Sequence, residues 1–395
     1  MKRSLRTLIA AALALLAAAA VLAGPPVRNG PLPPLFPPNN WWNQDISAAP
    51  VDPQSAAFIS FIGTSRGMHP DFGGDAGGDE IYGMPYIVVD ADQPELAVEF
   101  EYWDESDGVD YGTGHGIPFY PIPAEAITQP RWIEGGPPGN VHLDADRHMY
   151  IVDGDNGWLY ELYHVWWDGS RWTAGSGAFF DLAKNHRRPE GWTSADAAGL
   201  AILPGLVRYD EVFGEGEIGH AFRVTLRASN GYVWPASHAA GSNSSALPMG
   251  ARLRLKPGVN ISGFTPEVQK IFRAMKKYGL IMADNGSDLY VSGTYDTRWD
   301  NDVLNPAFAA IRASDFEVVL LGYNPCGDLN ADGSTNAADA GILARYLAGN
   351  ISRGEAPFSA PAGGADLDGD GAATVTDLTA LRHFLAGHIP FLPLE

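Results

Sequence analysis

The sequence predicts a mainly β protein in two parts. The first is a β-sandwich main domain of jelly-roll-like form over residues 41–322, with a few short helices, and the second is a small all-α domain over residues 326–395. Short β-type runs recur through the first part and are separated by glycine-rich turns. Few stretches of that part have the 3.6-residue apolar period of a helix. The second part has a polar loop in two copies, each followed by one amphipathic helix.

The N-terminal segment precedes both domains. Residues 1–23 begin with Lys2, Arg3 and Arg6 and continue as an alanine- and leucine-rich run, which is the pattern of a secretory signal peptide. This run is shorter than the ~20 apolar residues that cross a bilayer, and no later stretch approaches that length, so we expect no membrane span. Residues 24–40 are rich in proline and predict an extended strap. The protein is therefore expected to be secreted and extracellular.

The charge of the chain restricts its partners. The formal net charge is −21, from 26 basic and 47 acidic residues. Such a surface repels nucleic acid and anionic membranes, and it disfavours an anionic substrate such as a polyuronate. The only cysteine, Cys326, has no partner for an internal disulfide. We therefore expect stability to come from the apolar core and from bound ions.

The elements of the main domain follow from local patterns. Helices are predicted from Pro53 to Ile62, and from Pro266, with Thr265 as its N-cap, to just before Gly279. The DGDNG sequence at residues 153–157 predicts a hairpin turn. The predicted strands, which are rich in β-branched and aromatic residues, lie within 84–90, 96–103, 147–153, 158–167, 220–226 and 316–323.

Two copies of one acidic loop begin at Asp328 and Asp366. Each has oxygen-bearing side chains at loop places 1, 3, 5, 9 and 12, a glycine at place 6 and a backbone carbonyl at place 7. Calcium takes six to eight oxygen ligands, and the glycine permits the sharp turn that wraps the loop around the ion. The candidate ligands are Asp328, Asn330, Asp332, Ser334, Asn336 and Asp339, then Asp366, Asp368, Asp370, Ala372, Thr374 and Asp377.

Each loop is followed by an apolar helical stripe that ends at Gly349 or Gly387, whereas the segments before the loops contain helix breakers. A duplicated calcium loop with only the exiting helix resembles the type I dockerin, over about residues 326–390. This resemblance implies two calcium ions, a cohesin-type partner module and a role in polysaccharide catabolism. Places 10 and 11, which in the family help to select the cohesin, differ between the copies.

A first candidate for catalysis lies on a predicted strand. Alternation places Val98, Phe100 and Tyr102 on the core side and leaves Glu99, Glu101 and Trp103 together on the other side. Carboxylates at i and i+2 are ~6.5–7 Å apart along a strand, which is near the spacing used in glycoside hydrolysis. We expect Glu101 and Glu99 as the catalytic pair, with Trp103 stacking on a sugar. A solvated sheet face is the alternative.

A second candidate spans residues 192–238. It contains Asp196 and His220 as the alternative catalytic pair, and Arg223, Trp234 and His238 as substrate-binding residues. Acidic, basic, imidazole and indole groups at this density suit a site that positions a sugar or an acyl group. Structural ion pairs and capped turns would explain the same residues.

The adjacent tryptophans at 41–42 and 166–167 indicate that some indoles are exposed, because neighbours on a strand face opposite sides. Three functions remain open for the main domain. It is expected to be a glycoside hydrolase that acts on O-glycosyl bonds of a polysaccharide. The alternatives are a non-catalytic carbohydrate-binding or structural component of an extracellular complex, and a polysaccharide lyase that uses Tyr232, His238 and Arg223.

Overall fold

The structure is a computed structural model that describes residues 26–185, 187–330, 334–353, 356–358, 364–389 and 392–393. The predicted signal peptide, the start of the strap and the candidate ligand Asp332 lie outside the described residues. Among the described residues, none of the helices combines the length and the apolar character that crossing a bilayer requires.

Strands dominate the chain before Cys326. They are β1 (Val27–Arg28), β2 (His69–Asp71), β3 (Asp75–Gly77), β4 (Glu80–Ile81), β5 (Tyr86–Val89), β6 (Val98–Phe100), β7 (Val109–Asp110), β8 (His115–Gly116), β9 (Met149–Asp153), β10 (Trp158–Tyr163), β11 (Trp166–Trp167), β12 (Trp172–Ala174), β13 (Ser176–Asp181), β14 (Phe222–Leu226), β15 (Arg252–Leu255), β16 (Leu280–Asn285), β17 (Tyr290–Ser292) and β18 (Phe316–Val318). The helices are α2 (Ser55–Ile62), α3 (Glu125–Thr128), α4 (Tyr209–Phe213), α5 (Pro266–Lys277), α6 (Asn301–Ala310), α7 (Ala337–Leu347) and α8 (Val375–Leu385), with 3₁₀ turns η1 (Trp103–Glu105), η2 (Leu203–Gly205) and η3 (Ala313–Asp315).

A five-stranded sheet, in the order β1-β5-β9-β10-β13, lies between two apolar cores. On one face, Met149 and Ile151 of β9 pack in the same core as Val98 and Trp172 of the three-stranded sheet β11-β12-β6. On the other face, Tyr150 and Val152 join the larger core. This burial on both faces explains the continuous apolar runs of β5 and β9, which pair in parallel.

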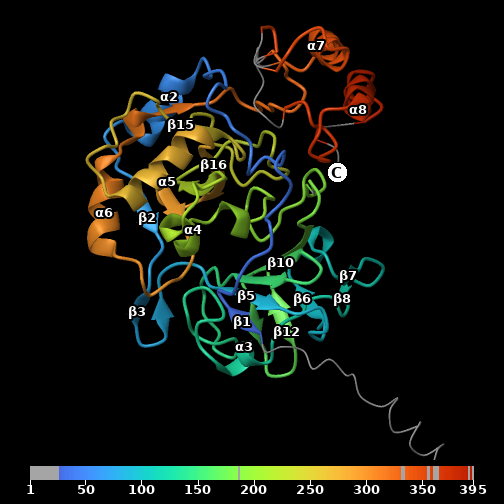
Figure 1. Ribbon diagram of the computed structural model, residues 1–395. Helices are drawn as coiled ribbons and strands as arrows, with labels where there is room; N and C mark the ends of the chain where they lie inside the picture. The colour runs from blue at the N-terminus through green and yellow to red at the C-terminus, as the bar shows by residue number, and fades with distance from the viewer. Residues whose placement is uncertain are drawn as a thin grey trace, which may run out of the picture.

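The larger core also supports a six-stranded sheet in the order β18-β15-β16-β14-β17-β2. Helices α2, α5 and α6 pack on this part of the molecule (Figure 1). The predicted start of α5 is confirmed, because the Thr265 hydroxyl accepts a hydrogen bond from the amide of Val268. Its buried stripe includes Ile271, Phe272 and Met275.

The main domain is rich in β-structure, as predicted, but its sheets differ from the expected jelly roll. A jelly roll consists of antiparallel strands, whereas the pairs β5–β9, β6–β12, β14–β16 and β2–β17 are parallel. Parallel neighbours need a long crossover. Between β14 and β16 that crossover includes β15 and helix α5.

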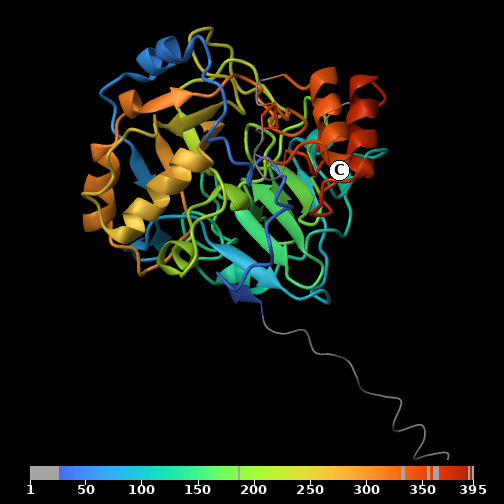
Figure 2. The same cartoon turned by 45° about the horizontal axis from the view of Figure 1, so that its top comes forward.

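The region from Cys326 onward has an apolar core of its own, to which α7 contributes Leu343 and α8 contributes Leu381. The two helices lie side by side at one edge of the molecule (Figure 2). Both end at glycines with positive φ, Gly349 and Gly387, as their sequences predict.

A buried amide network joins this region to the rest of the chain. The side-chain amide of Asn39, in the strap, donates to the carbonyl of Asp366 at 2.9 Å. The amide of Gln44 donates to the thiol of Cys326 at 3.1 Å and to the carbonyl of Asn39 at 2.9 Å. Asn39, Gln44 and Cys326 are all at least 95% buried. The strap therefore fixes the second acidic loop against the main domain.

Candidate functional sites

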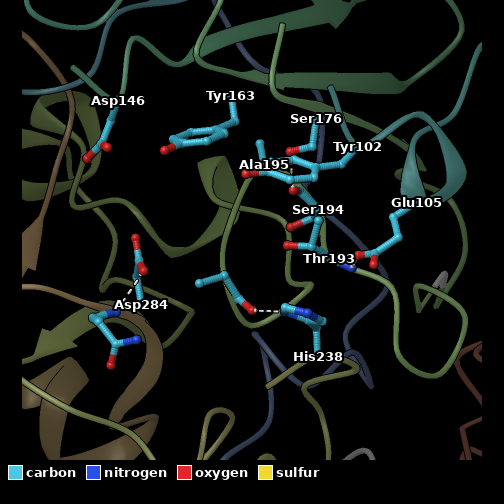
Figure 3. Close-up of a pocket in the computed structure, with 12 residues that line it drawn as sticks. Tyr102, Glu105, Asp146, Tyr163, Ser176, Thr193, Ser194, Ala195, His238 and Asp284 are labelled. Carbon is cyan, nitrogen blue, oxygen red and sulfur yellow. Dashed lines mark hydrogen bonds between the residues drawn. The ribbon is translucent and has the colours of Figure 1, made fainter. Parts of the chain in front are cut away.

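A central cavity of about 390 Å³ opens between the β-sheets of the main domain. The carboxyl groups of Asp146 and Asp284 approach it from one side and that of Glu105 from the other (Figure 3). The hydroxyl of Tyr163 points toward Asp146. The remaining lining residues are Tyr102, Ser176, Thr193, Ser194, Ala195, Ala197, His238 and Asn285. The cavity thus combines three carboxyl groups with aromatic and hydroxyl side chains.

Asp284 comes from β16 and is the carboxyl group with the most distinctive environment in this cavity. Its side chain accepts hydrogen bonds from Arg223 Nη2 at 3.0 Å and from the amide of Asn285 at 2.7 Å. Burial raises the pKa of Asp284 to about 6, and the positive charge of Arg223 offsets only part of this effect. The group is therefore able to carry a proton in mildly acidic water.

Arg223 lies beneath the cavity on β14 and is buried. It forms a two-pronged ion pair with Asp196, with both contacts at 2.8 Å, and also donates to the Ser292 hydroxyl at 2.9 Å. Burial by itself would lower the pKa of Arg223, but the charge and hydrogen bonds of Asp196, together with the charge of Asp284, outweigh it and the pKa is raised. The guanidinium is thus a fixed charge that Asp196 and Asp284 share.

A second ion pair, between the buried His148 and the partly exposed Glu134, lies beside the cavity. His148 Nδ1 is 2.6 Å from Glu134 Oε2, and its Nε2 is 2.9 Å from the carbonyl oxygen of Ala195. Both acceptors need an N–H, so the imidazole is protonated. Burial alone would shift both groups toward neutrality, but their mutual attraction prevails. It raises the pKa of His148 to about 9 and lowers that of Glu134 to about 2.

Glu161 of β10 binds the chain segment that follows the cavity-lining residues Ala195 and Ala197. Its buried carboxyl group accepts from the amides of Ile202 and Leu203 at 2.8–2.9 Å, where η2 begins. Burial raises the pKa of Glu161 to about 7, although these hydrogen bonds favour its charged form. The segment that leads from the cavity lining at Ala195 to η2 is held by this group.

The first predicted catalytic pair is not at this cavity. Alternation is correct within β6, where Val98 and Phe100 are buried and Glu99 is partly exposed. It fails beyond the strand, because β6 ends at Phe100 and Tyr102, which was predicted to face the core, is 47% exposed. Glu99 instead contacts His115 Nδ1 at 3.1 Å and Arg171 at 4.0 Å. Neither Glu99 nor Glu101 lines the central cavity, and their predicted catalytic role stays a prediction.

Trp103 begins the 3₁₀ turn η1, is 39% exposed and does not line the central cavity. The tryptophans at 41–42 differ from the prediction, because both are buried. They lie in a turn, where alternation does not apply. Trp166 and Trp167 are each partly exposed.

The second predicted cluster is divided. His238 lines the central cavity and its Nδ1 is 2.8 Å from the carbonyl oxygen of Ala197, whereas Asp196 and Arg223 lie beneath the cavity as an ion pair. His220 faces elsewhere, 3.0 Å from Glu211, at a separate cavity near the strap. Trp234 is partly buried against Trp41. Asp196 and His220 therefore do not meet, and no finding tests the roles predicted for these residues.

Sequence reasoning did not select Asp146, Asp284, Glu105, Tyr102 or Tyr163 for the cavity. They come from separate segments: Asp146 precedes β9, Tyr163 ends the antiparallel neighbour β10, Asp284 lies on β16 of the six-stranded sheet, and Tyr102 and Glu105 follow β6. Asp284 carried one usable signal, since it is a carboxyl group near the end of an otherwise apolar strand.

The acidic loops of the C-terminal region have the geometry of cation sites. Carboxylate oxygens of Asp366, Asp368 and Asp370 lie within 4.8 Å of one another, and Gly371 has the positive φ that its loop place requires. At place 12, the buried Asp377 closes the second loop by accepting the amides of Leu367 at 2.6 Å and Thr374 at 2.6 Å.

The first loop closes in the same way. Asp339 accepts the amides of Leu329 and Asn336, each at 2.8 Å. Asp328, at place 1, is also buried. The oxygen-only donor set in both loops fits a hard cation such as calcium.

These observations define a modular protein, in which a β-rich main domain carries a small helical module with paired cation loops. The C-terminal module is a type I dockerin: residues 326–386 match the family described as the Dockerin type I domain, which confirms the resemblance. Dockerin domains bind calcium and cohesin modules. No curated protein and no solved structure matches the chain.

Proposed function

We propose that this protein is secreted and degrades a polysaccharide by hydrolysing O-glycosyl bonds in the central cavity. Its dockerin, with one calcium ion in each loop, attaches it to a cohesin-bearing partner in an extracellular complex. The observation that carries the proposal is Asp284, a carboxyl group with a pKa of about 6 in a cavity that also holds Asp146. Glycoside hydrolysis needs two carboxyl groups, one of which stays protonated.

The two carboxyl groups have different roles in this proposal. Asp284 donates its proton to the glycosidic oxygen, because burial keeps it neutral to a higher pH than an ordinary aspartate. Asp146, on the exposed rim, acts as the carboxylate that attacks the sugar or activates a water. Tyr102 and Tyr163 offer aromatic surface to sugar rings.

Two observations count against the lyase. A lyase needs a free cation near the substrate carboxylate, but the guanidinium of Arg223 is buried and bound by Asp196 and Asp284. The three carboxyl groups of the cavity would also repel a uronate. A non-catalytic carbohydrate-binding protein would use the same cavity, and the variant below separates it from a hydrolase.

The test is Asp284→Asn, compared with wild type on neutral polysaccharides and on polygalacturonate. Hydrolysis, followed by new reducing ends, should fall roughly 10²–10⁴-fold while binding is retained. Asp302→Asn, which changes an exposed aspartate at the start of α6, is the matched control and should keep full activity. Products that absorb in the ultraviolet would indicate a lyase, and binding without cleavage by wild type would indicate a binding protein.

A further inference from the structure

A second cavity of about 290 Å³ adjoins the central one. It is lined by Asp71, Tyr82, Met84, Glu134, Asp146 and Arg147, among others. Asp146 lines both cavities, so they meet at this carboxyl group. The volumes of both cavities are near the lower end of the range for small-molecule pockets, ~300–1,000 Å³.

The two cavities also share a floor. His148 connects Ala195, which lines the central cavity, to Glu134, which lines the second one. Both nitrogens of its ring have partners and the ring is buried, so the floor is fixed. Charge interactions link Arg223, below it, to Asp71 in the second cavity and to Asp284 in the central one.

The second cavity offers the groups that bind a sugar unit. Tyr82 is 55% exposed and presents a ring for stacking. The carboxyl groups of Asp71, Glu134 and Asp146 can accept hydrogen bonds from hydroxyl groups. The guanidinium of the lining residue Arg147 is only 2% exposed, and its Nη1 and Nη2 already donate to the carbonyls of Pro137 and Pro138. The cavity therefore suits an uncharged sugar and repels a uronate.

We infer that the two cavities form one cleft that binds an internal stretch of an uncharged polysaccharide, with sugar units on both sides of Asp146. This inference rests on the proposed function and deepens it, since it specifies the substrate class and the mode of attack. A chain that occupies both cavities passes across Asp146, so cleavage takes place within the polymer and not at its end.

The test measures binding by calorimetry, with hydrolysis blocked by Asp284→Asn in the full chain with calcium. The probes are the disaccharides and hexasaccharides of the cello-, xylo- and manno-series, and a hexamer of galacturonate. We expect a neutral hexamer to bind at least tenfold more tightly than its disaccharide, because only the hexamer reaches both cavities.

Tyr82→Ala should remove most of this preference for the hexamer, whereas Tyr82→Phe should keep it because the ring remains. Tyr111→Ala, which changes another exposed tyrosine that lines neither cavity, should leave it unchanged.

The possible results separate the inference from the proposed function. An unchanged hexamer preference in Tyr82→Ala would overturn the inference and leave hydrolysis untouched. So would the failure of every neutral hexamer to bind at millimolar concentration, or equally tight binding of the galacturonate hexamer. Length-dependent binding that Tyr82→Ala removes, in a protein whose wild type cleaves nothing, would uphold the cleft and refute the hydrolase.

Discussion

At the scale of single residues, Asp196 and Asp284 share the guanidinium of Arg223 unequally. Asp196 is buried and takes both prongs of Arg223, while Asp284 receives a single hydrogen bond from it. The charge of Asp196 also disfavours a second negative charge at Asp284. The pair Arg223–Asp196 thus keeps Asp284 in place, and burial keeps its pKa high.

This arrangement predicts how the proposed hydrolysis depends on pH. Asp284 acts as the acid, so kcat/KM should fall as the pH rises through about 6 and the group loses its proton. The measurement is a pH profile of kcat/KM on a neutral polysaccharide. Constant activity from pH 5 to pH 8 would exclude Asp284 as the proton donor.

The Glu134–His148 pair predicts a pH window for stability. The lowered pKa of Glu134 stabilises the fold above about 4.5, and this contribution is lost as the pH falls toward about 2. The raised pKa of His148 stabilises it below about 6.5, and this contribution is lost as the pH rises toward about 9.

Glu134→Gln should therefore lower the free energy of unfolding by about 3–5 kcal/mol between pH 4.5 and 6.5, because it leaves a buried imidazolium without its partner. Denaturant titrations of wild type and variant across pH 3–9 check this. The difference should shrink on both sides of the window, and a difference independent of pH would contradict the assignment.

At the scale of elements, local patterns determine where helices and strands occur but not which strands pair. The Thr265 cap, the 153–157 turn and the glycines after α7 and α8 are local signals, and the structure agrees with each of them. Alternation also predicted which side of β6 is buried. It could not show that β6 pairs with β12 at the edge of a small sheet, with Glu99 facing His115 and not the cavity.

The candidate sites were predictable only where local sequence patterns define them. The acidic loops are complete within short stretches of sequence, so spacing alone identified them. The central cavity instead joins Asp146 before β9, Asp284 on β16 and Glu105 in η1, which belong to three different sheets or their connections and meet only when those sheets pack together. His238 was found because polar residues are dense around it, and that density also selected His220, which faces elsewhere.

The loops predict separable calcium sites. Asp328 and Asp366 hold the first place of each loop, so Asp328→Ala and Asp366→Ala should each remove one site, and calorimetric titration should count one ion in place of two. Asp302→Ala is the control and should retain two. If either single variant lost both ions, the loops would be coupled and not independent.

At the scale of the whole molecule, the strap is the connection between the two parts. Its Asn39 contacts the second loop through Asp366, and Gln44, just after the strap, contacts both Asn39 and Cys326. Burial raises the pKa of the Cys326 thiol to about 12, so the thiol is both enclosed and protonated. Because Cys326 is the only cysteine, its reactivity reports on this junction alone.

Asn39→Ala should open the junction, since it removes the hydrogen bond to Asp366 and the side-chain contacts that go with it. We expect the reaction of the native protein with an aromatic disulfide reagent to be slow, and to accelerate at least tenfold in Asn39→Ala or after calcium is chelated. Asn260→Ala, which changes an exposed asparagine in a surface loop, should react like wild type. Equal rates in all variants would show that Asn39 does not close the junction.

The amide contact between Asn39 and the second loop also has a consequence for any assembly that the dockerin joins. A domain on a flexible linker takes many positions and orientations around its point of attachment. Here Asn39 and Gln44 bind the dockerin to the strap and the main domain, so we expect the central cavity to keep a fixed position relative to the dockerin. Under the proposed function, movement of the cavity over a polysaccharide would then come from the cohesin-bearing partner.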